Sequence, residues 1–384
     1  MPKRIILAVT NDLATDQRVD RTCTSLAEEG YEVVLVGRRL PESPELDSRP
    51  YSTQRMRLLF RRSALFYAEY NVRLFLKLLF SKADAFFAND TDTLLACSLA
   101  ATLRGKQLFF DAHELFPEVP ELVDKPCVKA VWEKIERRCL PHVDAAFTVC
   151  QSVADEYYKR YGVEMTVVRN LAKRATGKPA LSTADGGSTL LYQGAVNVGR
   201  GVREAIDAME YLPDCRLVVA GDGDLLDELR EHCSHQAWGE RIDFLGRVCP
   251  DELHKLTRQA SLGLCLLEDL GLNYRYALPN RVGDFAQAGV PLLATDFPEI
   301  HRIMEEYGIG TLTEACPHAK QGCEYEDFVR HLAQTIRQAL DYWHSMPEQE
   351  RARRFGRAGE ELCWEKEKML LNDKINTIFL TNVR

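Results

Sequence analysis

The chain has 384 residues, more than a single typical hydrophobic core organises, so we expect two domains. Hydrophobic residues make up 46% of the sequence and charged residues 28%, both ordinary values for a soluble globular protein. The 49 basic and 57 acidic residues give a net charge of −8, which argues against a surface that coats nucleic acid, so no nucleic-acid partner is expected.

Residues 1–10 are basic and then apolar, but the apolar run is short, lacks a small-residue cleavage site and is followed by Asn11-Asp12. This pattern predicts a first strand and not a signal peptide, and no apolar stretch is long enough to span a bilayer. The 12 cysteines are scattered, and none forms a Cys-x-x-Cys pair. We therefore expect reduced, buried cysteines in a cytoplasmic protein, without a disulfide framework or a zinc site.

Short apolar runs alternate with amphipathic segments along most of the chain. Strands are expected at 4–9, 32–36, 84–88, 107–111, 144–148 and 164–168, and helices at 17–29, 91–103, 127–139 and 151–160. A second series of strands is expected at 189–193, 216–220, 242–245, 262–266, 291–294 and 309–312, followed by a helical pattern from about 324 to 380. This alternation is typical of a parallel sheet with helices on both faces. The predicted fold class is α/β, with two tandem doubly wound Rossmann-like domains and a helical C-terminal tail.

The domain boundaries are expected where this alternation stops and restarts. Residues 172–188 are polar, rich in Gly, Pro and Ser, and without periodicity, which predicts a linker. It would join an N-terminal domain, 1–171, to a C-terminal domain, 189–360, and a helix within 361–384 would pack back on the N-terminal domain. Ligands of such sheets bind outside the carboxyl ends of the strands, so a cleft between the two domains is the expected site.

Polar side chains follow two strands of the first half. The first strand is followed by Asn11, Asp12, Asp16 and Arg18, where Thr15 or Asp16 could cap the next helix and Asp12 or Asp16 could equally bind a ligand. The strand ending near 111 is followed by His113 and Glu114 in a loop broken by prolines. Such a pair could bind sugar hydroxyls or move a proton, or His113 could make a structural hydrogen bond; its position favours function.

Residues 55–82 form a basic block in an otherwise acidic chain. The segment contains seven arginines and lysines and a single acidic residue, Glu69, and aromatic and aliphatic residues are interleaved with them. A basic amphipathic helix of this kind suits an anionic membrane surface, and a core helix with a solvated basic face explains the pattern equally well.

Glycine-rich turns follow several strands of the second half. The segments run from Tyr192-Gln193-Gly194 to Arg200-Gly201, then Gly221-Asp222-Gly223, Phe244-Leu245-Gly246, and finally Leu278 to Pro291. In the last segment Pro279 is expected in the first turn of a short helix, beside Asn280 and Arg281, with Asp284 one turn later and Gly289 at its end. A helix start with free backbone donors and a nearby cation favours an anion such as a nucleotide-sugar phosphate, although an ordinary helix between two core strands would look the same.

In order and spacing these segments resemble the family 4 (group 1) glycosyltransferases of GT-B architecture, the type that builds bacterial surface polysaccharides. The resemblance implies that Arg200 holds the donor diphosphate, that Asp284 grips the donor ribose, and that His113 lies near the transferred sugar and the acceptor. It implies catalytic roles for His113, Arg200 and Arg281. The implied donor-binding residues are Gly194, Arg200, Gly221, Asp222, Gly246, Leu278, Asn280, Arg281 and Asp284, and the implied acceptor-side residues are Asn11, Asp12, Asp16, Arg18 and Glu114.

The chain departs from the family pattern at several of these positions. The family usually has a glutamate at the position of Asp284 and another glutamate eight residues earlier, where this chain has Tyr276. The family usually holds the donor diphosphate with two basic residues, and the first of these positions is Ala195 in this chain. Asn11-Asp12 stands where the family usually has two glycines. Because Arg281 could replace the missing charge, we expect Asn280, Arg281 and the helix-start amides to carry more of the donor contact than Asp284.

The expected function is that of a retaining glycosyltransferase of the hexosyltransferase type. It would move a sugar from a nucleoside-diphosphate-sugar donor to a hydroxyl of a glycan or lipid-linked acceptor, without a cofactor or a metal, because cations and a helix dipole stabilise the leaving diphosphate. It would be cytoplasmic and peripheral on the inner face of the plasma membrane, attached through 55–82. The alternatives are a nucleotide-sugar epimerase or phosphorylase of the same fold, or an inactive donor-binding subunit.

Overall fold

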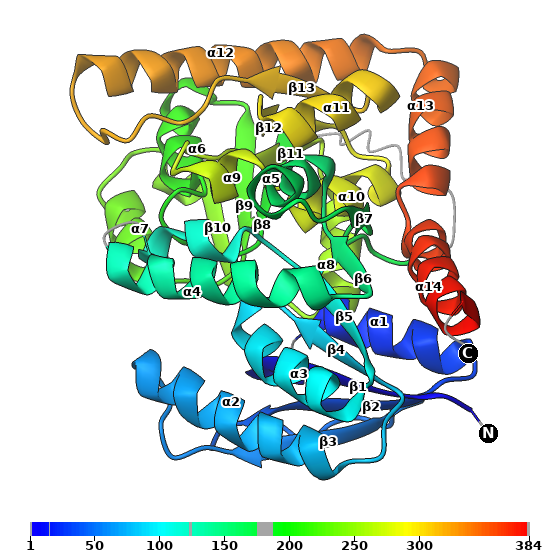
Figure 1. The fold of residues 1–384 in the computed structure, drawn as a ribbon. Coiled ribbons are helices and arrows are strands. Elements are labelled where there is room, and N and C mark those ends of the chain that lie inside the picture. The colour runs from blue at the N-terminus through cyan, green and yellow to red at the C-terminus, as the bar shows by residue number, and fades with distance from the viewer. Residues whose placement is uncertain (1, 15, 123–124, 175–186, 382–384) are drawn as a thin grey trace. The chain divides into compact units, whose positions relative to one another are not determined.

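The computed structural model of the protein describes residues 2–14, 16–122, 125–174 and 187–381 (Figure 1). The chain divides into two compact units. Unit 1 comprises Met1–Asn170 and Glu367–Arg384, and unit 2 comprises Leu171–Lys366. The domain boundaries expected from the sequence stay a prediction, and most of the expected linker 172–188 lies outside the described residues.

In the described part of unit 1, seven parallel strands form one sheet in the order β3-β2-β1-β4-β5-β6-β7. The strands are β1 (Arg4–Asp12), β2 (Glu32–Arg39), β3 (Ser52–Arg57), β4 (Ala85–Asn89), β5 (Gln107–Ala112), β6 (Ala145–Thr148) and β7 (Met165–Val167). Central β1 pairs with β2 and β4, with Ile6 opposite Val34 and Phe86. The strand order reverses between β1 and β4, and a ligand site is expected outside the carboxyl ends of strands at such a point.

Helices connect the strands of unit 1. They are α1 (Gln17–Glu28), α2 (Ser63–Phe80), α3 (Thr91–Arg104), α4 (Pro126–Cys139) and α5 (Gln151–Tyr161), with 3₁₀ turns at Phe116–Glu118, Pro120–Leu122 and Leu140–His142. Asp16 caps α1 by accepting the backbone N–H of Val19. Glycines in the left-handed conformation end two of the helices, Gly105 after α3 and Gly162 after α5.

The last helix, α14 (Trp364–Thr381), packs on the same unit. Phe379 meets Phe109 edge to face, with ring centres 5.7 Å apart. Glu367 is almost fully buried and accepts hydrogen bonds from the backbone N–H of Arg169 at 2.7 Å and from its side-chain Nε at 2.8 Å. These apolar and charged contacts tie residues 367–381 to the end of β7 and to the sheet.

The described part of unit 2 contains a second parallel sheet, of six strands in the order β10-β9-β8-β11-β12-β13. The strands are β8 (Ser188–Gln193), β9 (Cys215–Ala220), β10 (Ile242–Gly246), β11 (Leu262–Cys265), β12 (Leu292–Thr295) and β13 (Gly310–Thr313). The helices are α6 (Val202–Ala208), α7 (Leu226–Ser234), α8 (Pro250–Gln259), α9 (Leu272–Arg275), α10 (Asn280–Ala288), α11 (Pro298–Tyr307), α12 (Cys323–Ser345) and α13 (Glu348–Glu361), with 3₁₀ turns at Met209–Tyr211 and Gly239–Arg241. The strand order reverses between β8 and β11.

The predicted fold class is confirmed: both units are doubly wound α/β sheets, and helices α12, α13 and α14 form the C-terminal tail. The interpretation of 55–82 as one helix is wrong, because Arg55 and Arg57 belong to β3 and α2 begins only at Ser63. Strand β3 was not predicted because its residues are mostly polar, are half-buried or exposed, and form no apolar run. Pro279 is the N-cap of α10 and not part of its first turn, and its extended backbone conformation explains the difference.

Candidate functional site

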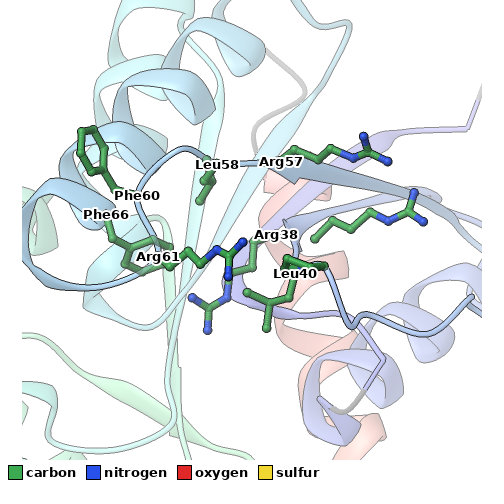
Figure 2. Close-up of a pocket in the computed structure, with 9 residues that line it drawn as sticks. Arg38, Leu40, Arg57, Leu58, Phe60, Arg61 and Phe66 are labelled. Carbon is green, nitrogen blue, oxygen red and sulfur yellow. The ribbon is translucent and has the colours of Figure 1, made fainter.

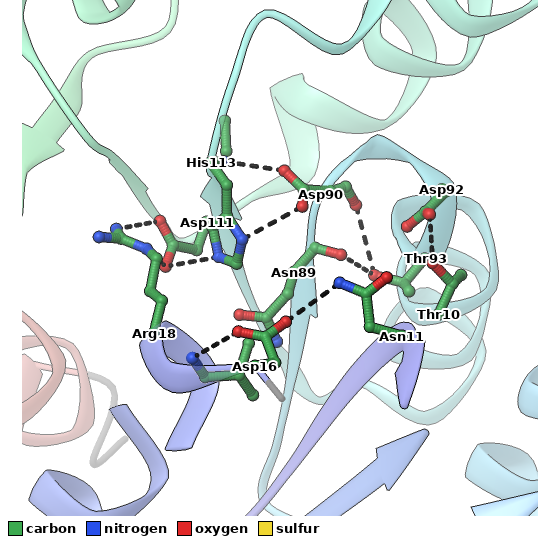
Figure 3. A network of polar contacts seen from close by, with 12 residues as sticks. Thr10, Asn11, Asp16, Arg18, Asn89, Asp90, Asp92, Thr93, Asp111 and His113 are labelled. Atoms are coloured by element: carbon green, nitrogen blue, oxygen red, sulfur yellow. Dashed lines mark hydrogen bonds and ion pairs between the residues drawn. The ribbon is translucent and has the colours of Figure 1, made fainter. Parts of the chain in front are cut away.

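Three neighbouring strands of unit 1 end in polar side chains that meet around His113 (Figure 3). His113 follows β5, and its Nδ1 lies 3.2 Å from Oδ2 of Asp90 at the end of β4. Its Nε2 lies 3.3 Å from Oδ2 of Asp111, and its backbone N–H donates to Oδ1 of Asp90 at 2.8 Å. The imidazole is therefore held between two carboxylates at the edge of the sheet, and both of its ring nitrogens face an acceptor.

Asp111 is itself fixed from the other side by Arg18. The buried guanidinium of Arg18 donates to both carboxylate oxygens, at 2.9 and 2.7 Å, and to the carbonyl oxygen of Val168 at 2.7 Å. A bidentate pair of this kind holds both groups in one geometry. The pair thus joins α1, β5 and the end of β7, and it orients the carboxylate that contacts His113.

These contacts set the charge of the cluster. Burial alone would lower the pKa of His113, but Asp90 and Asp111 outweigh it and raise that pKa to about 9, so the ring is an imidazolium at neutral pH. Burial would raise the pKa of Asp111, but Arg18 and His113 outweigh it and hold that pKa well below its usual range. His113 is therefore a hydrogen-bond donor at neutral pH and has no lone pair to act as a base.

Asp90 has an unusual backbone, with φ +60° and ψ 164°. This region is essentially restricted to glycine, and a side chain there costs of order 1–3 kcal/mol unless the surroundings enforce it. The backbone N–H of Asp90 donates to the carbonyl oxygen of Asp111 at 2.8 Å, and its carboxylate binds His113. Strain of this kind is common at functional sites, which makes Asp90 a candidate that the sequence analysis missed.

Asp92 lies in the first turn of α3 and is also part of this edge. Its Oδ2 accepts the Thr10 hydroxyl at 2.5 Å, from the end of β1. Burial and the neighbouring Asp90 raise the pKa of Asp92 to about 8, and burial raises that of Asp90 to about 6 against the opposing effect of His113. The pair Asp90 and Asp92 therefore presents one carboxylate and one carboxylic acid at neutral pH. In the described residues, no three His, Cys, Asp or Glu side chains are placed to hold a metal ion.

The other residues expected on the acceptor side lie at the same edge with different partners. Asn11 donates to Asp16 at 3.2 Å, and Glu114 lines a cavity with Asp90 and Asp92. Asp12 instead accepts the Ser43 hydroxyl and the backbone N–H of Ala14, with Arg55 3.8 Å away. Asp12 and the buried Arg18 are thus engaged in holding the loops, whereas Asn11 and Glu114 border open space.

Glycines bring two strand ends of unit 2 into backbone contact. A β-carbon added at Gly221, after β9, would meet the carbonyl oxygen of Gly194 at 1.8 Å. Gly194, after β8, has φ +132°, and a β-carbon there would lie 3.1 Å from Nη2 of Arg281. Only glycine fits at Gly221, and at Gly194 it lets the backbone approach the guanidinium closely.

Arg281 and Arg200 lie close to Cys265, where β11 ends beside β8. Arg281 is buried, with its guanidinium carbon 4.5 Å from the centre of the Tyr192 ring and Nη2 donating to the Tyr192 hydroxyl at 3.3 Å. The guanidinium carbon of Arg200 lies 4.8 Å from the centre of the Tyr274 ring. Burial raises the pKa of the Cys265 thiol, and both cations oppose that effect. Within the described residues, Nη1 of Arg281 and Nε of Arg200 are buried and have no hydrogen-bond partner. Two incompletely paired cations at this point can receive an anionic ligand.

Other expected donor residues surround this pair in different ways. Oδ2 of Asp284 accepts Nε2 of Gln193 at 3.1 Å, and Thr257 holds the opposite end of the same amide at 2.8 Å. Asn280 is exposed at the first turn of α10, and Leu278 packs against the core. Asp222 is exposed after β9, and Gly246 ends β10, two strands from β8.

Two family models match the chain in succession. The model described as Glycosyltransferase Family 4 matches residues 16–175, and the model described as Glycosyl transferases group 1 matches residues 187–341. The chain belongs to the family 4 (group 1) glycosyltransferases. The family that the motifs resembled is thereby confirmed, and the protein is a glycosyltransferase of the GT-B type.

Solved structures with the same fold span the whole glycosyltransferase chain. Sucrose-phosphate synthase from Thermosynechococcus elongatus has a TM-score of 0.78 at 14% identity, covering 99% of this chain and 100% of the other. Anabaena HepE in complex with UDP has a TM-score of 0.71 at 11% identity, covering 98% and 100%. WaaG, a glycosyltransferase involved in lipopolysaccharide biosynthesis, has a TM-score of 0.67 at 14% identity, covering 99% and 100%. No curated protein sequence matches the chain.

Asp90, Asp92, Tyr192 and Gln193 help to hold the two clusters of this glycosyltransferase, and the sequence motifs did not single them out as site residues. Asp90 and Asp92 follow the apolar run 84–88, so their place after a predicted strand was an available signal. Tyr192 and Gln193 lie inside a segment that was noted only for its glycines and Arg200. Their roles depend on Arg281 and Asp284, about 90 residues away along the chain, and no local pattern reports such pairing.

Proposed function

We propose that the protein is a retaining glycosyltransferase that moves a sugar from a nucleoside-diphosphate sugar to a hydroxyl of a glycan or lipid-linked acceptor. The observation that carries the proposal is a pair of incompletely paired guanidinium groups, that of buried Arg281 beside Gly194 and that of half-buried Arg200. A diphosphate supplies the negative charge and the acceptor oxygens that both groups need. HepE, a structure of similar fold, has been solved with UDP and with UDP-glucose, and the retaining outcome is that of the family pattern.

The two arginines would act on the leaving group. When the bond between the sugar and the diphosphate breaks, negative charge develops on the departing phosphate oxygen. Arg200, Arg281 and the first backbone N–H groups of α10 would stabilise that charge, since a helix N-terminus carries partial positive charge. Asn280 would contact the donor from that first turn. This assignment requires no metal and no cofactor, and it makes Arg200 and Arg281 catalytic residues of the donor side.

The carboxylate of Asp284 would receive the donor ribose, as the family pattern implies. Its link to Gln193 and Thr257 holds the shorter side chain in place beside Arg281. Gly194, Gly221 and Asp222 would line the phosphate side through their backbone, while Leu278 and Gly246 would border the nucleoside. Asp284 would thus orient the donor and leave the charge stabilisation to the arginines.

His113 would position the acceptor and the transferred sugar as a hydrogen-bond donor. Because Asp90 and Asp111 keep its pKa near 9, the imidazolium cannot take the acceptor proton at neutral pH. The departing phosphate oxygen would take that proton on the same face of the sugar as the acceptor attacks, so one bond to the anomeric carbon breaks while the other forms. Asn11, Asp16 and Glu114 would border the acceptor, and Arg18 and Asp12 would act by holding the cluster and its loops.

The exposed face of α2 would attach the enzyme to an anionic membrane surface. Four apolar side chains at helical spacing remain exposed on it: Leu65, Val72, Leu76 and Phe80, the last at 83%. Arg61 and Arg62 precede the helix and are exposed, whereas Arg73 pairs with Glu69 at 2.8 Å and Lys77 donates to Gln54 at 2.7 Å. An apolar stripe beside basic residues favours an anionic interface. Among the described helices, none has the length and apolar content to cross a bilayer.

Donor binding and turnover test the enzymatic proposal. The protein is screened against a panel of nucleoside-diphosphate sugars by thermal shift, because a ligand that binds only the native state raises the melting temperature. The bound donor is then incubated without an acceptor and with glycan acceptors. Slow hydrolysis alone and transfer with acceptor support the proposal, whereas conversion to an epimer, phosphate-dependent cleavage, or binding without any turnover supports the alternatives.

Two variants locate the reaction in the arginine pair. Arg200→Gln and Arg281→Gln are expected to reduce turnover by about 100-fold each, the usual effect of removing one charge-stabilising donor. Arg353→Gln, at an exposed position on α13, is the matched control and should retain wild-type turnover. Undiminished turnover in Arg200→Gln with an unchanged melting temperature would remove Arg200 from the site.

Membrane attachment is tested separately by co-sedimentation with phosphatidylglycerol vesicles. Leu65→Ser together with Phe80→Ser should release the protein from the vesicles, and Leu103→Ser, an exposed leucine on α3, serves as the control. If the wild-type protein does not sediment with these vesicles, the membrane proposal fails while the enzymatic proposal stands.

A further inference from the structure

Two adjoining cavities of unit 1 link the His113 cluster to a group of arginines. The larger, about 420 Å³, is lined by Thr10, Asn11, Asp90, Asp92 and Glu114 among others. The smaller, about 310 Å³, is lined by Arg38, Arg39, Arg57 and Arg61 together with Leu58, Phe60 and Phe66 (Figure 2). Arg38, Arg61 and Phe66 line both cavities, so one continuous surface leads from the carboxylates to the cations.

The arginines of the smaller cavity lack anionic partners. Within the described residues, none of the four forms an ion pair, and no Asp or Glu is among the residues that line this cavity. Arg38 lies with its guanidinium carbon 4.9 Å from the centre of the Phe66 ring, and its buried Nε has no hydrogen-bond partner in that part of the chain. Four like charges around one cavity repel one another, and an anion in the cavity would relieve this repulsion.

The start of α2 provides a second, independent feature of this site. Ser63, which lines the larger cavity, is the first residue of an 18-residue helix that has no side-chain N-cap bond and no acidic residue in its first turn. The backbone N–H groups there point out of the helix and carry its partial positive charge. Ser63 also has φ +70°, which is uncommon for serine. The helix start thus presents donors to the larger cavity, which Arg38 and Arg61 also line.

Apolar side chains accompany these cations. Leu58, Phe60 and Phe66 share the smaller cavity with the arginines, and Phe60 is 44% exposed. A free inorganic anion would use only the arginines, whereas an anion joined to a hydrocarbon chain would use both kinds of side chain. The chemistry of the wall therefore favours a phosphate or diphosphate that carries an apolar group.

We propose that the smaller cavity is an acceptor subsite that binds a phosphate or diphosphate group joined to an apolar chain, while the reacting hydroxyl occupies the larger cavity beside Asp90. This inference rests on the proposed function and narrows it, because it makes the acceptor an anionic, lipid-linked glycan. Arg39 and Arg57 line only the smaller cavity, Arg38 and Arg61 line both, and the carboxylates line only the larger one. The anion would therefore set which sugar of the acceptor reaches Asp90.

Soluble probes test the subsite without any turnover. Binding of geranyl diphosphate, inorganic pyrophosphate and geraniol to the full chain is measured by isothermal titration calorimetry. The wild type is expected to bind geranyl diphosphate at least tenfold more tightly than pyrophosphate, and to bind geraniol weakly or not at all. Raising the salt concentration should weaken diphosphate binding. Failure to bind geranyl diphosphate overturns the proposal.

Variants then assign the binding to the cavity. The double variant Arg38→Gln/Arg61→Gln should bind geranyl diphosphate at least tenfold more weakly than the wild type. If the double variant does not fold, Arg57→Gln, at an exposed position, provides the same test. Arg138→Gln, exposed on α4 outside both cavities, is the matched control. Unchanged binding in Arg38→Gln/Arg61→Gln or in Arg57→Gln overturns the subsite.

Two further measurements separate this proposal from the others. Affinity for UDP or the donor found by thermal shift should be the same in the wild type and in Arg38→Gln/Arg61→Gln, so loss of the subsite is distinguishable from loss of the donor site. Phosphatidylglycerol vesicles provide the second source of phosphate. If the arginine variants lose vesicle binding while the wild type ignores soluble geranyl diphosphate, the arginines serve the membrane surface and the acceptor subsite is refuted.

Discussion

The guanidinium of Arg281 lies over the ring of Tyr192, 4.5 Å from its centre, and donates to the hydroxyl of the same residue at 3.3 Å. Tyr192 is the penultimate residue of β8, and Arg281 is in the first turn of α10. Burial would lower the pKa of Arg281, but Tyr192, Cys265 and Asp284 outweigh it and raise that pKa. The pair holds a cation at the point where the strand order of unit 2 reverses.

This relationship predicts that Arg281 cannot be replaced by another cation. Arg281→Lys keeps the charge but loses the planar guanidinium, which in the wild type stacks on Tyr192 while its Nη1 stays available to a ligand. We therefore expect kcat/KM to fall at least about tenfold. Tyr192→Phe keeps the ring, so we expect kcat/KM to fall only a few-fold. Steady-state kinetics with the identified donor measures both. Equal effects of the two substitutions would contradict a role for the planar group.

The His113 cluster predicts a pH dependence of stability. A group whose pKa is raised by folding, here from 6.5 to about 9, stabilises the fold fully below pH 6.5 and loses that contribution as the pH rises toward 9. The contribution is up to about 3 kcal/mol, since one pKa unit corresponds to about 1.4 kcal/mol. Urea unfolding between pH 6 and 10 should therefore show the wild type losing stability relative to His113→Gln. A constant difference between the two proteins would mean that folding does not raise the pKa of His113.

The backbone of Asp90 predicts an unusual ranking of substitutions. Asp90→Gly should be more stable than Asp90→Ala by about 1–3 kcal/mol, because only glycine adopts φ +60° and ψ 164° without strain. Both should lose activity through the loss of the carboxylate that holds His113. Urea unfolding at one pH measures the ranking. If the alanine variant is the more stable of the two, the backbone conformation of Asp90 is not enforced by the fold.

The close approach of β8 and β9 predicts which glycines tolerate a methyl group. Gly221→Ala would place its β-carbon 1.8 Å from the carbonyl oxygen of Gly194, so the protein should lose more than about 2 kcal/mol of stability or fail to fold. Gly356→Ala, in the interior of α13 with nothing within 4 Å, should be neutral or stabilise by up to about 1 kcal/mol. Thermal unfolding compares the two. A stable Gly221→Ala variant would show that the two loops can separate.

The sequence by itself determined the fold class and the segments that carry the donor motifs. Strands such as β9, β11 and β12 contain short apolar runs, and α10 begins at Asn280 and is followed by a left-handed Gly289, as the local signals predicted. Such features depend on neighbouring residues, because periodicity, capping and glycine turns are local properties of a chain. Edge strand β3 was not predicted for the same reason, because its exposed polar residues show no periodic pattern of burial.

Only the tertiary structure decided which of these side chains meet. Arg18 and Asp111 are 93 residues apart in the chain and form a buried bidentate pair, and Asp90 meets His113 because β4 and β5 end side by side. The charge on His113 follows from that meeting, not from its own neighbours in the sequence. Arg38 and Arg61 likewise face one cavity only because β2 and the start of α2 are brought together by the fold. Sheet order sets these distances, and with them the charges and cavities from which a function is inferred.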